Sequence, residues 1–209
     1  MVNPWEALSL DHYEAHMLYK NVQQAQALNL IMKNQLNIFP VKSICILGIS
    51  GGNGLEHINV DSISKIYGLD INDKYLSICR SRFPDLSGKL ELRQIDLMSY
   101  QAKIPDTELI TANLVIEYLG VKTFKNIITS SNARYLSCVI QKNENGDFVS
   151  STPFENYFND ISCVHQDIDK NELRDTLDEI GFGVVYIENV KTPNGKILIR
   201  MDFERMGDF

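Results

Sequence analysis

The stretch Ser43–Gly54, with the sequence SICILGISGGNG, decides how this chain folds. Its first five residues form a near-continuous apolar run, typical of a strand buried on both faces in a parallel sheet. The glycine-rich turn that follows lets the backbone approach a ligand without a Cβ in the way, and a helix after it would aim its N-terminal amides at that ligand. Tight turns also need glycine for their own geometry, so this stretch alone is weak support for a binding site.

Polar side chains follow the next apolar segments. Asp70 comes directly after Ile63–Leu69, and Asp96 and Asn113 end the two segments after that. The carboxyl ends of parallel strands meet at one edge of a sheet, where α/β proteins bind ligands, and an acidic residue at the end of the second strand can accept hydrogen bonds from ribose hydroxyls. Each of these residues could instead cap a helix or start a turn.

Hydrophobic periodicity and turn residues predict an α/β fold. We expect a doubly wound, mostly parallel seven-stranded sheet with an antiparallel C-terminal hairpin strand, because Thr192–Gly195 is a strong hairpin signal. The chain is interpreted as a single domain, 1–209, with an N-terminal helical lid at 1–39 and a probable substrate loop at 142–167. The expected strands are 43–47, 63–69, 90–95, 107–112, 133–141, 183–190 and 195–203, and the expected helices are 10–35, a short one at 55–58, 73–82, 123–130 and 170–180.

Composition narrows the function classes. The 209 residues are 44% hydrophobic, enough for one sizeable core, and 20 Lys and Arg against 27 Asp and Glu give a net charge of −7, which argues against nucleic acid as a partner. Apolar runs are strand-length, so we expect no membrane association, and the N-terminus does not resemble a signal peptide. Four scattered cysteines without a CxxC pair favour reduced core thiols, no metal site and a cytoplasmic location. The oligomeric state is not readable.

The motifs resemble those of the class I (Rossmann-like) S-adenosylmethionine (SAM)-dependent methyltransferases. Ile44–Gly54 resembles their first motif, Tyr67–Ile71 the second, Leu92–Leu97 the third and Asn113–Tyr118 the fourth. The terminal hairpin is similar to their antiparallel seventh strand. Two positions depart from the family pattern: Ile46 replaces the usual acidic residue, and Ser50 replaces the second glycine.

The resemblance implies SAM as cofactor and methyl transfer to a small-molecule acceptor of unknown identity. Gly48, Ser50 and Gly52 would line its methionine part, Asp70 would bind the ribose and Asp96 the adenine amino group. The complete set of expected cofactor-binding residues is Gly48, Ile49, Ser50, Gly52, Asp70, Ile71, Asp96, Leu97 and Asn113.

Methyl transfer depends mostly on proximity and alignment, and a general base is needed only when the acceptor must lose a proton. Candidate bases are His16 on the N-terminal helix, Glu117 after the fourth strand and His165 at the end of the substrate loop. Each has a plainer interpretation: a solvated helix residue, a helix-starting Glu and a loop histidine. Expected substrate contacts are Tyr13, Tyr118 and Tyr157.

Two other functions fit parts of the pattern. A non-catalytic SAM-binding module is compatible with everything above, and Ser50 mildly favours it. An NAD(P)-dependent oxidoreductase shares the strand–glycine–acid arrangement, but the turn does not fit GxGxxG. Methylation of base amino groups is not expected, because Asn113 is followed by Leu114-Val115 and not by two prolines.

Overall fold

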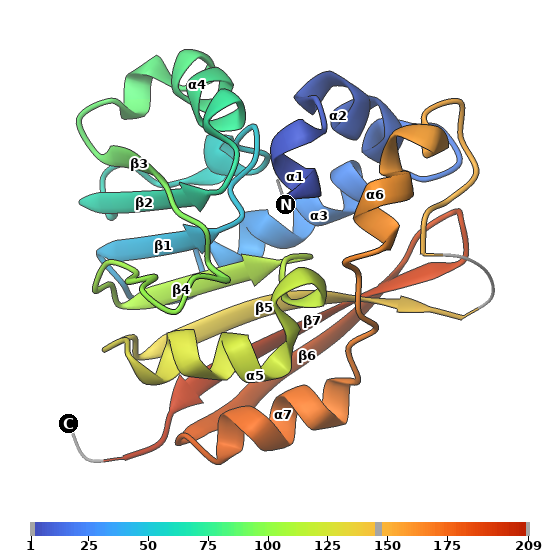
Figure 1. The fold of residues 1–209 in the computed structure, drawn as a ribbon. Coiled ribbons are helices and arrows are strands. Elements are labelled where there is room, and N and C mark those ends of the chain that lie inside the picture. The colour runs from blue at the N-terminus through green and yellow to red at the C-terminus, as the bar shows by residue number, and fades with distance from the viewer. Residues whose placement is uncertain (1–2, 145–147, 208–209) are drawn as a thin grey trace.

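Seven strands form one sheet in the order β3-β2-β1-β4-β5-β7-β6 (Figure 1). The computed structural model describes residues 3–144 and 148–207. Strands β1 to β5 are parallel, and β7 pairs antiparallel with both β5 and β6. The expected fold class is therefore confirmed. The strands are β1 (Ser43–Leu47), β2 (Lys65–Asp70), β3 (Leu90–Gln94), β4 (Leu109–Asn113), β5 (Tyr135–Asn143), β6 (Phe182–Lys191) and β7 (Lys196–Arg205).

Helices cover both faces of the sheet. Ile44 and Ile46 of β1 pack in the cluster that contains α3 and α4, while Cys45 and Leu47 pack in the cluster that contains α5 and α7. The alternation explains why β1 is apolar throughout, since neighbouring residues face opposite layers. The longer helices are α2 (Leu10–Leu18), α3 (Gln24–Gln35), α4 (Asp73–Arg82), α5 (Ile116–Thr129) and α7 (Lys170–Asp178).

The prediction of a single helix over residues 10–35 is wrong, because this region forms two helices, α2 and α3. The chain leaves α2 at Tyr19 and re-enters α3 after Gln23, which has a left-handed φ of 50°. Because the chain breaks between the two helices, α3 packs on the sheet and α2 does not belong to the same core cluster. A further helix, α1 (Pro4–Ala7), begins with a capping box. The Asn3 side chain accepts a hydrogen bond from the Glu6 amide, and the Glu6 side chain accepts one from the Asn3 amide.

The turn after β1 also differs. Only the 3₁₀ turn η1 (Leu55–His57) follows the glycines, and the chain then runs directly to β2. A turn this short supplies no helix dipole of the kind expected from the sequence. Helix α3, which precedes β1 in the chain, packs against β1 in place of a helix between β1 and β2. Helix α5 begins at Ile116 and not at residue 123, and Gly120 interrupts it with φ 73° and ψ 153°.

The expected loop at 142–167 contains regular structure. Strand β5 continues to Asn143, and η3 (Glu155–Phe158) and α6 (Asn159–Ser162) follow. Residues 145–147 lie outside the described residues. Among the helices that the structure describes, none combines the length and apolarity needed to cross a bilayer.

Candidate functional site

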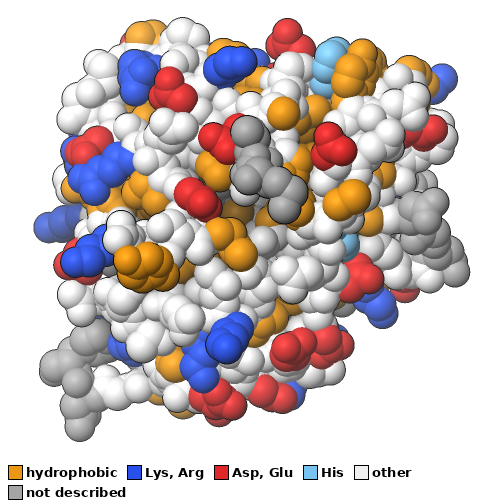
Figure 2. All heavy atoms as spheres, viewed as in Figure 1, with side chains coloured by type: hydrophobic (Ala, Val, Ile, Leu, Met, Phe, Trp, Pro, Cys, Tyr) orange, Lys and Arg blue, Asp and Glu red, His pale blue; other side chains and the backbone are white. Residues whose placement is uncertain are grey.

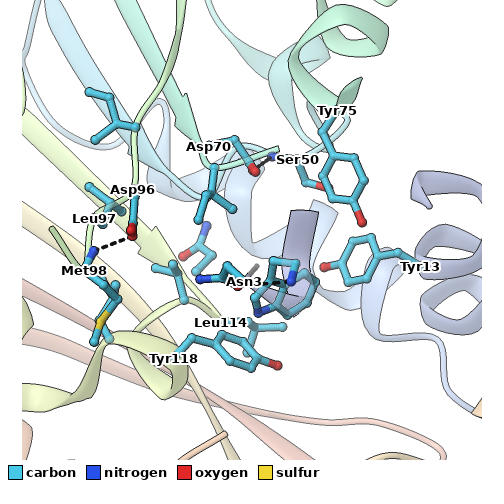
Figure 3. A pocket seen from close by; sticks show the side chains of 17 residues that line it. Asn3, Tyr13, Ser50, Asp70, Tyr75, Asp96, Leu97, Met98, Leu114 and Tyr118 are labelled. Atoms are coloured by element: carbon cyan, nitrogen blue, oxygen red, sulfur yellow. Dashed lines mark hydrogen bonds between the residues drawn. The ribbon is translucent and has the colours of Figure 1, made fainter. Parts of the chain in front are cut away.

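A cavity of about 700 Å³, including its open part, lies at the carboxyl ends of β1, β2 and β4; we call it the main cavity (Figure 3). Seven of the nine residues expected to bind cofactor line it: Gly48, Ser50, Asp70, Ile71, Asp96, Leu97 and Asn113. They come from four separate segments of the chain, and the parallel register of the sheet brings them together.

Asp70 is held rigidly at the end of β2. Its Oδ2 accepts a hydrogen bond of 2.8 Å from the Ser50 amide, and its Oδ1 accepts one of 2.9 Å from the Asn72 amide (Figure 3). A carboxylate has about four acceptor sites, so acceptor capacity remains for a ligand. Burial raises the pKa of Asp70, and hydrogen bonds from the amides of Asn72, Ser50 and Ile71 partly oppose that shift. The carboxylate is thus oriented, nearly buried and still able to accept from a diol.

Ser50 has a conformation that favours glycine. Its φ is 53°, and its Oγ is buried with no hydrogen-bond partner among the described residues. Left-handed backbone costs a non-glycine residue about 1–2 kcal/mol, and an unpaired buried hydroxyl adds to that cost. A strained residue with an unpaired donor beside Asp70 is consistent with a ligand that would accept this hydrogen bond.

Ile49 and Gly52 do not line the main cavity. Ile49 is 5% exposed and fills the space above Gly68, where an added Cβ would lie 2.3 Å from Ile49 Cδ1. Gly52, with φ 88°, packs against Cys79 and Phe83. Both residues border a second hollow on the other side of the turn. Their expected role in cofactor binding stays a prediction.

Asp96 and Asn113 complete the rim. Asp96 lies two residues beyond β3, and its Oδ1 accepts a 2.9 Å hydrogen bond from the Met98 amide. Asn113, the last residue of β4, exchanges hydrogen bonds with Gln35 of α3. Both polar atoms of the Asn113 side chain are therefore already hydrogen-bonded to Gln35. A ligand can contact Asn113 only alongside these two hydrogen bonds.

The N-terminal segment contributes Asn3, Trp5 and Tyr13 to the lining of the main cavity. We keep the name lid for this segment, and its role as a lid stays a prediction. Figure 1 shows α1 and α2 beside the end of the sheet towards which β4 points, and Figure 3 shows Asn3 in the middle of the cavity. Asn72 Nδ2 donates to the Trp5 carbonyl at 2.8 Å, and Tyr75 Oη donates to the Leu8 carbonyl at 3.0 Å. These contacts tie the lid to the segment that follows Asp70.

A bidentate ion pair also fixes the lid. Arg82 of α4 donates to both carboxylate oxygens of Glu14 on α2, at 2.5 and 2.8 Å. The guanidinium crosses directly over Gly51, where a Cβ would lie 2.5 Å from Arg82 Nη1. A side chain at Gly51 would therefore displace the Arg82 and Glu14 side chains, although the φ of Gly51 is not left-handed.

A smaller cavity of about 450 Å³, including its open part, adjoins the main cavity; we call it the side chamber. Four residues line both: Trp5, Tyr13, Leu114 and Tyr118. The residues that line only the side chamber are His16, Met17, Gln24, Glu117, Gln141, Phe148, Val149 and Phe158. Two candidate bases, His16 and Glu117, therefore share one chamber.

Both side chains are buried. Glu117 is 1% exposed; its Oε1 accepts a 2.7 Å hydrogen bond from the Gln141 amide, and its Oε2 has no partner within residues 3–144 and 148–207. Burial raises the pKa of Glu117 to about 7. His16 is 3% exposed and lies 2.9 Å from Thr152 Oγ1 through Nδ1, and burial lowers its pKa to about 4. His16 is thus a neutral buried imidazole and not a solvated helix residue.

The candidates His165 and Tyr157 lie outside both cavities. His165 stacks on Phe148 at 3.6 Å between ring centroids, behind the chamber wall, and burial lowers its pKa. Tyr157 is 51% exposed and stacks on His12 at 3.6 Å. Its neighbour Phe158 lines the side chamber instead. Tyr13 and Tyr118 lie where we expected substrate contacts, and their role remains a prediction.

A buried polar network was missed by sequence reasoning. It runs from Asn113 through Gln35 and Ser137 to Asp202, which pairs with Arg200 at 2.6 Å; both charged side chains are 1% exposed. The sequence signal is Arg200 and Asp202 two positions apart on one face of an otherwise apolar strand. The network anchors the cofactor-side end of β4 to β5 and β7.

Comparisons with known proteins define the fold. The sequence matches no protein-family model and no curated protein. The structure is similar to the N-methyltransferase NodS from Bradyrhizobium japonicum in complex with S-adenosyl-L-homocysteine (SAH), with TM-score 0.67, 11% identity and coverage of 97% of this chain and 98% of that one. It is also similar to the magnesium protoporphyrin IX methyltransferase ChlM from Synechocystis PCC 6803 with bound SAH, with TM-score 0.64, 12% identity and 93% of each chain covered.

A third similar structure is that of a protein with a different activity. The [4+2]-cyclase SpnF matches with TM-score 0.66 and 12% identity, over 90% of this chain and 84% of that one. The protein therefore has the fold of the class I (Rossmann-like) methyltransferases, confirming the resemblance seen in the sequence. At these identities the comparisons establish the fold, and the reaction must be argued from the site.

Proposed function

We propose that this protein binds S-adenosylmethionine in the main cavity and transfers its methyl group to a small-molecule acceptor. The observation that carries the proposal is the convergence of Gly48, Ser50, Asp70, Asp96 and Asn113 on one cavity. When bound, the cofactor supplies a methyl carbon activated by a positively charged sulfur.

The residues present fit this cofactor. Asp70 keeps acceptor capacity for a ribose hydroxyl, and Ser50 Oγ offers an unpaired donor for a carboxylate. The sheet order also favours this function over the oxidoreductase alternative, because dinucleotide-binding sheets continue in parallel order 3-2-1-4-5-6, whereas here β7 inserts antiparallel between β5 and β6. The lid excludes water and holds an acceptor close to the methyl group, which is the main contribution a protein makes to this reaction.

A small acceptor suits the covered site. Residues of the N-terminal lid line both cavities and limit the size of an acceptor, and Figure 2 shows acidic and basic side chains interspersed over the face it displays. The net charge of −7 supports a partner other than nucleic acid. The cysteines are free, with Cys45, Cys79 and Cys138 buried, which supports a reducing cytoplasmic location.

Calorimetry with SAH tests the cofactor assignment. We expect Asp70→Ala to weaken SAH binding by about 1–3 kcal/mol, because the ribose hydrogen bonds are lost. Asp70→Asn retains an acceptor for one backbone amide and should weaken binding less. Asp61→Ala removes an exposed carboxylate elsewhere and is the matched control. Unchanged SAH affinity in a folded Asp70→Ala protein would refute the site.

Turnover distinguishes an enzyme from a binding module. Incubation with SAM and a set of small acceptors should produce SAH at a rate that depends on the acceptor. Tight SAH binding without acceptor-dependent SAH formation across such a set would favour the non-catalytic alternative.

A further inference from the structure

We propose that the side chamber binds a small, planar, uncharged acceptor whose hydroxyl group donates its proton to Glu117 Oε2. The proposal rests on the proposed methyl transfer and names the acceptor class and the proton acceptor. It is carried by three features of the chamber: its walls, its unpaired polar atoms and its junction with the main cavity.

Rings form half of the wall, since six of the twelve lining residues carry one. Trp5 meets Tyr118 edge-on at 4.8 Å and Tyr13 edge-on at 5.7 Å, and Phe148 packs edge-on to Tyr118 at 6.2 Å. Phe158 and His16 form the opposite part of the wall, with their ring centroids 4.4 Å apart. Flat apolar walls of this kind favour a flat apolar ligand, through stacking and edge-to-face contacts.

Two residues of the lining each have a buried polar atom without a hydrogen-bond partner. Glu117 Oε2 is a buried acceptor, and Trp5 Nε1 is a buried donor, and neither forms a hydrogen bond with any described residue. Unpaired buried polar groups are costly, so their presence together in one cavity wall indicates a ligand that pairs them. A hydroxyl group supplies the donor that Glu117 lacks, and an oxygen on the same ligand supplies an acceptor for Trp5.

The junction places the chamber beside the methyl donor. Leu114 lines both cavities directly after Asn113 and has φ 55°, a left-handed conformation that is rare for leucine. Its amide donates to the Val139 carbonyl at 2.8 Å, which holds the turn. Strained backbone at the boundary between two cavities is characteristic of functional sites. Glu117 follows three residues later, so the same turn positions the proton acceptor.

Charge selects the acceptor class. An anion would be repelled by Glu117. A protonated amine has no lone pair, and the pKa of Glu117, about 7, lies below that of an ordinary amine, so the proton would remain on nitrogen. A neutral hydroxyl keeps a lone pair while it donates to Glu117. The groups that face or perturb Glu117 are Tyr13, His16, Tyr118, Cys138 and Asp167.

The transfer step balances. The hydroxyl oxygen's lone pair forms the new bond to the methyl carbon, and the carbon–sulfur bond breaks with its electrons going to sulfur. The hydroxyl proton passes to Glu117 Oε2 and leaves to solvent before the next turnover. Because the Gln141 amide already holds Oε1, the carboxyl group needs no reorientation for this transfer.

The test uses 4-nitrophenol as the probe, with the full chain, with and without SAH. We expect one-to-one binding, measured by calorimetry, and a rise in the phenolate absorbance of the probe on binding, because its proton passes to Glu117. Glu117→Gln should weaken binding at least tenfold and abolish this rise in phenolate absorbance. Trp5→Phe, which keeps a ring but removes the donor, should weaken binding several-fold. Glu179→Gln, which removes a carboxylate paired with Lys125, should bind like the parent protein.

Two further ligands make the test specific. The methyl ether 4-nitroanisole should bind more weakly and without dependence on Glu117, because it has no proton to donate. Benzylamine should bind more weakly than 4-nitrophenol. Absence of 4-nitrophenol binding, Glu117-independent binding, or tighter Glu117-dependent binding of benzylamine would overturn the acceptor class. These ligand measurements on the parent protein remain informative if Glu117→Gln fails to fold.

The result is separable from the proposed function. SAH binding without 4-nitrophenol binding would leave the cofactor site intact and refute the chamber assignment. Binding of 4-nitrophenol without SAH binding would support the chamber and refute the methyltransferase proposal.

Discussion

Gln35 and Asn113 exchange two hydrogen bonds, each 2.9 Å long, at the carboxyl end of β4. Gln35 Nε2 also donates to Ser137 at 2.9 Å, and Gln35 is fully buried. This pair fixes the direction of Asn113, a residue expected beside the cofactor, from a helix that lies far away in the sequence. The orientation of the site thus depends on α3 as well as on the strand ends.

Gln35→Ala should therefore reduce both stability and SAH affinity. It leaves the Asn113 amide without its partner and removes the donor to Ser137 Oγ, which keeps its bond to Asp202. We expect a loss of about 1–3 kcal/mol in the free energy of unfolding. SAH binding should weaken several-fold because Asn113 loses its orientation. Urea denaturation and calorimetry measure the two effects. Gln26→Ala, on the exposed side of the same helix, is the control, and equal effects of both variants would contradict this interpretation.

The Arg200–Asp202 pair provides a second test of the network. Asp202→Ala should destabilise the protein by about 3–5 kcal/mol, because a fully buried guanidinium is left without its carboxylate. The double variant Arg200→Met with Asp202→Leu removes both charges and should recover much of that loss. Chemical denaturation of the two variants measures the difference. If the double variant were less stable than Asp202→Ala, the cost would come from lost packing and not from the unpaired charge.

The sequence predicted the sheet because its signals are local. Each signal is contained within a few consecutive residues. The signals are the apolar run of β1, the polar residues at the ends of β2 to β4, and the turn at Thr192–Gly195. Seven of nine expected cofactor residues line one cavity for the same reason: parallel strands bring their carboxyl ends together. Helix α1 could have been recognised from Asn3, Pro4 and Glu6, which form a capping box.

Other features depend on tertiary contacts that a single sequence does not contain. Periodicity continues across residues 10–35, although the chain turns at 19–23 so that α3 can pack on the sheet while α2 reaches Arg82. Ile49 is placed by the missing Cβ of Gly68 on the next strand. Tyr157 and Phe158 are adjacent aromatics, and only packing determines that Phe158 faces the side chamber.

Glu117 makes stability depend on pH in a predictable direction. Its pKa is about 7 in the folded protein and has the ordinary value of 4.5 when exposed. Between these values the folded state binds more protons than the unfolded state, so the stabilisation is present below pH 4.5 and is lost as pH rises to about 7.

Glu117→Gln should therefore become more stable relative to the parent protein as pH rises through this window, by up to about 3 kcal/mol. Urea denaturation at several pH values measures the difference. His16 titrates in both proteins, so its contribution cancels, and Glu179→Gln controls for loss of a carboxylate at an exposed position. A stability difference that stays constant from pH 4.5 to 7 would contradict the raised pKa.

Replacing Ser50 by glycine should raise the stability of the protein and weaken SAH binding. Ser50→Gly relieves the left-handed φ of 53° and removes an unpaired buried hydroxyl, so the free protein should gain about 1 kcal/mol of stability. SAH binding should weaken by about 0.5–1.5 kcal/mol, because the hydroxyl can no longer donate to the cofactor. Thermal denaturation and calorimetry measure the two changes.

Ser50→Ala distinguishes the two causes. It removes the hydroxyl but keeps the Cβ and the strain, so it should lose SAH affinity as Ser50→Gly does, without the gain in stability. Tighter SAH binding by Ser50→Gly than by the parent protein would mean that the serine only disturbs a turn better served by glycine. Weaker binding by both variants would mean that Ser50 is strained because its hydroxyl serves the ligand, and that its departure from the family's glycine is functional.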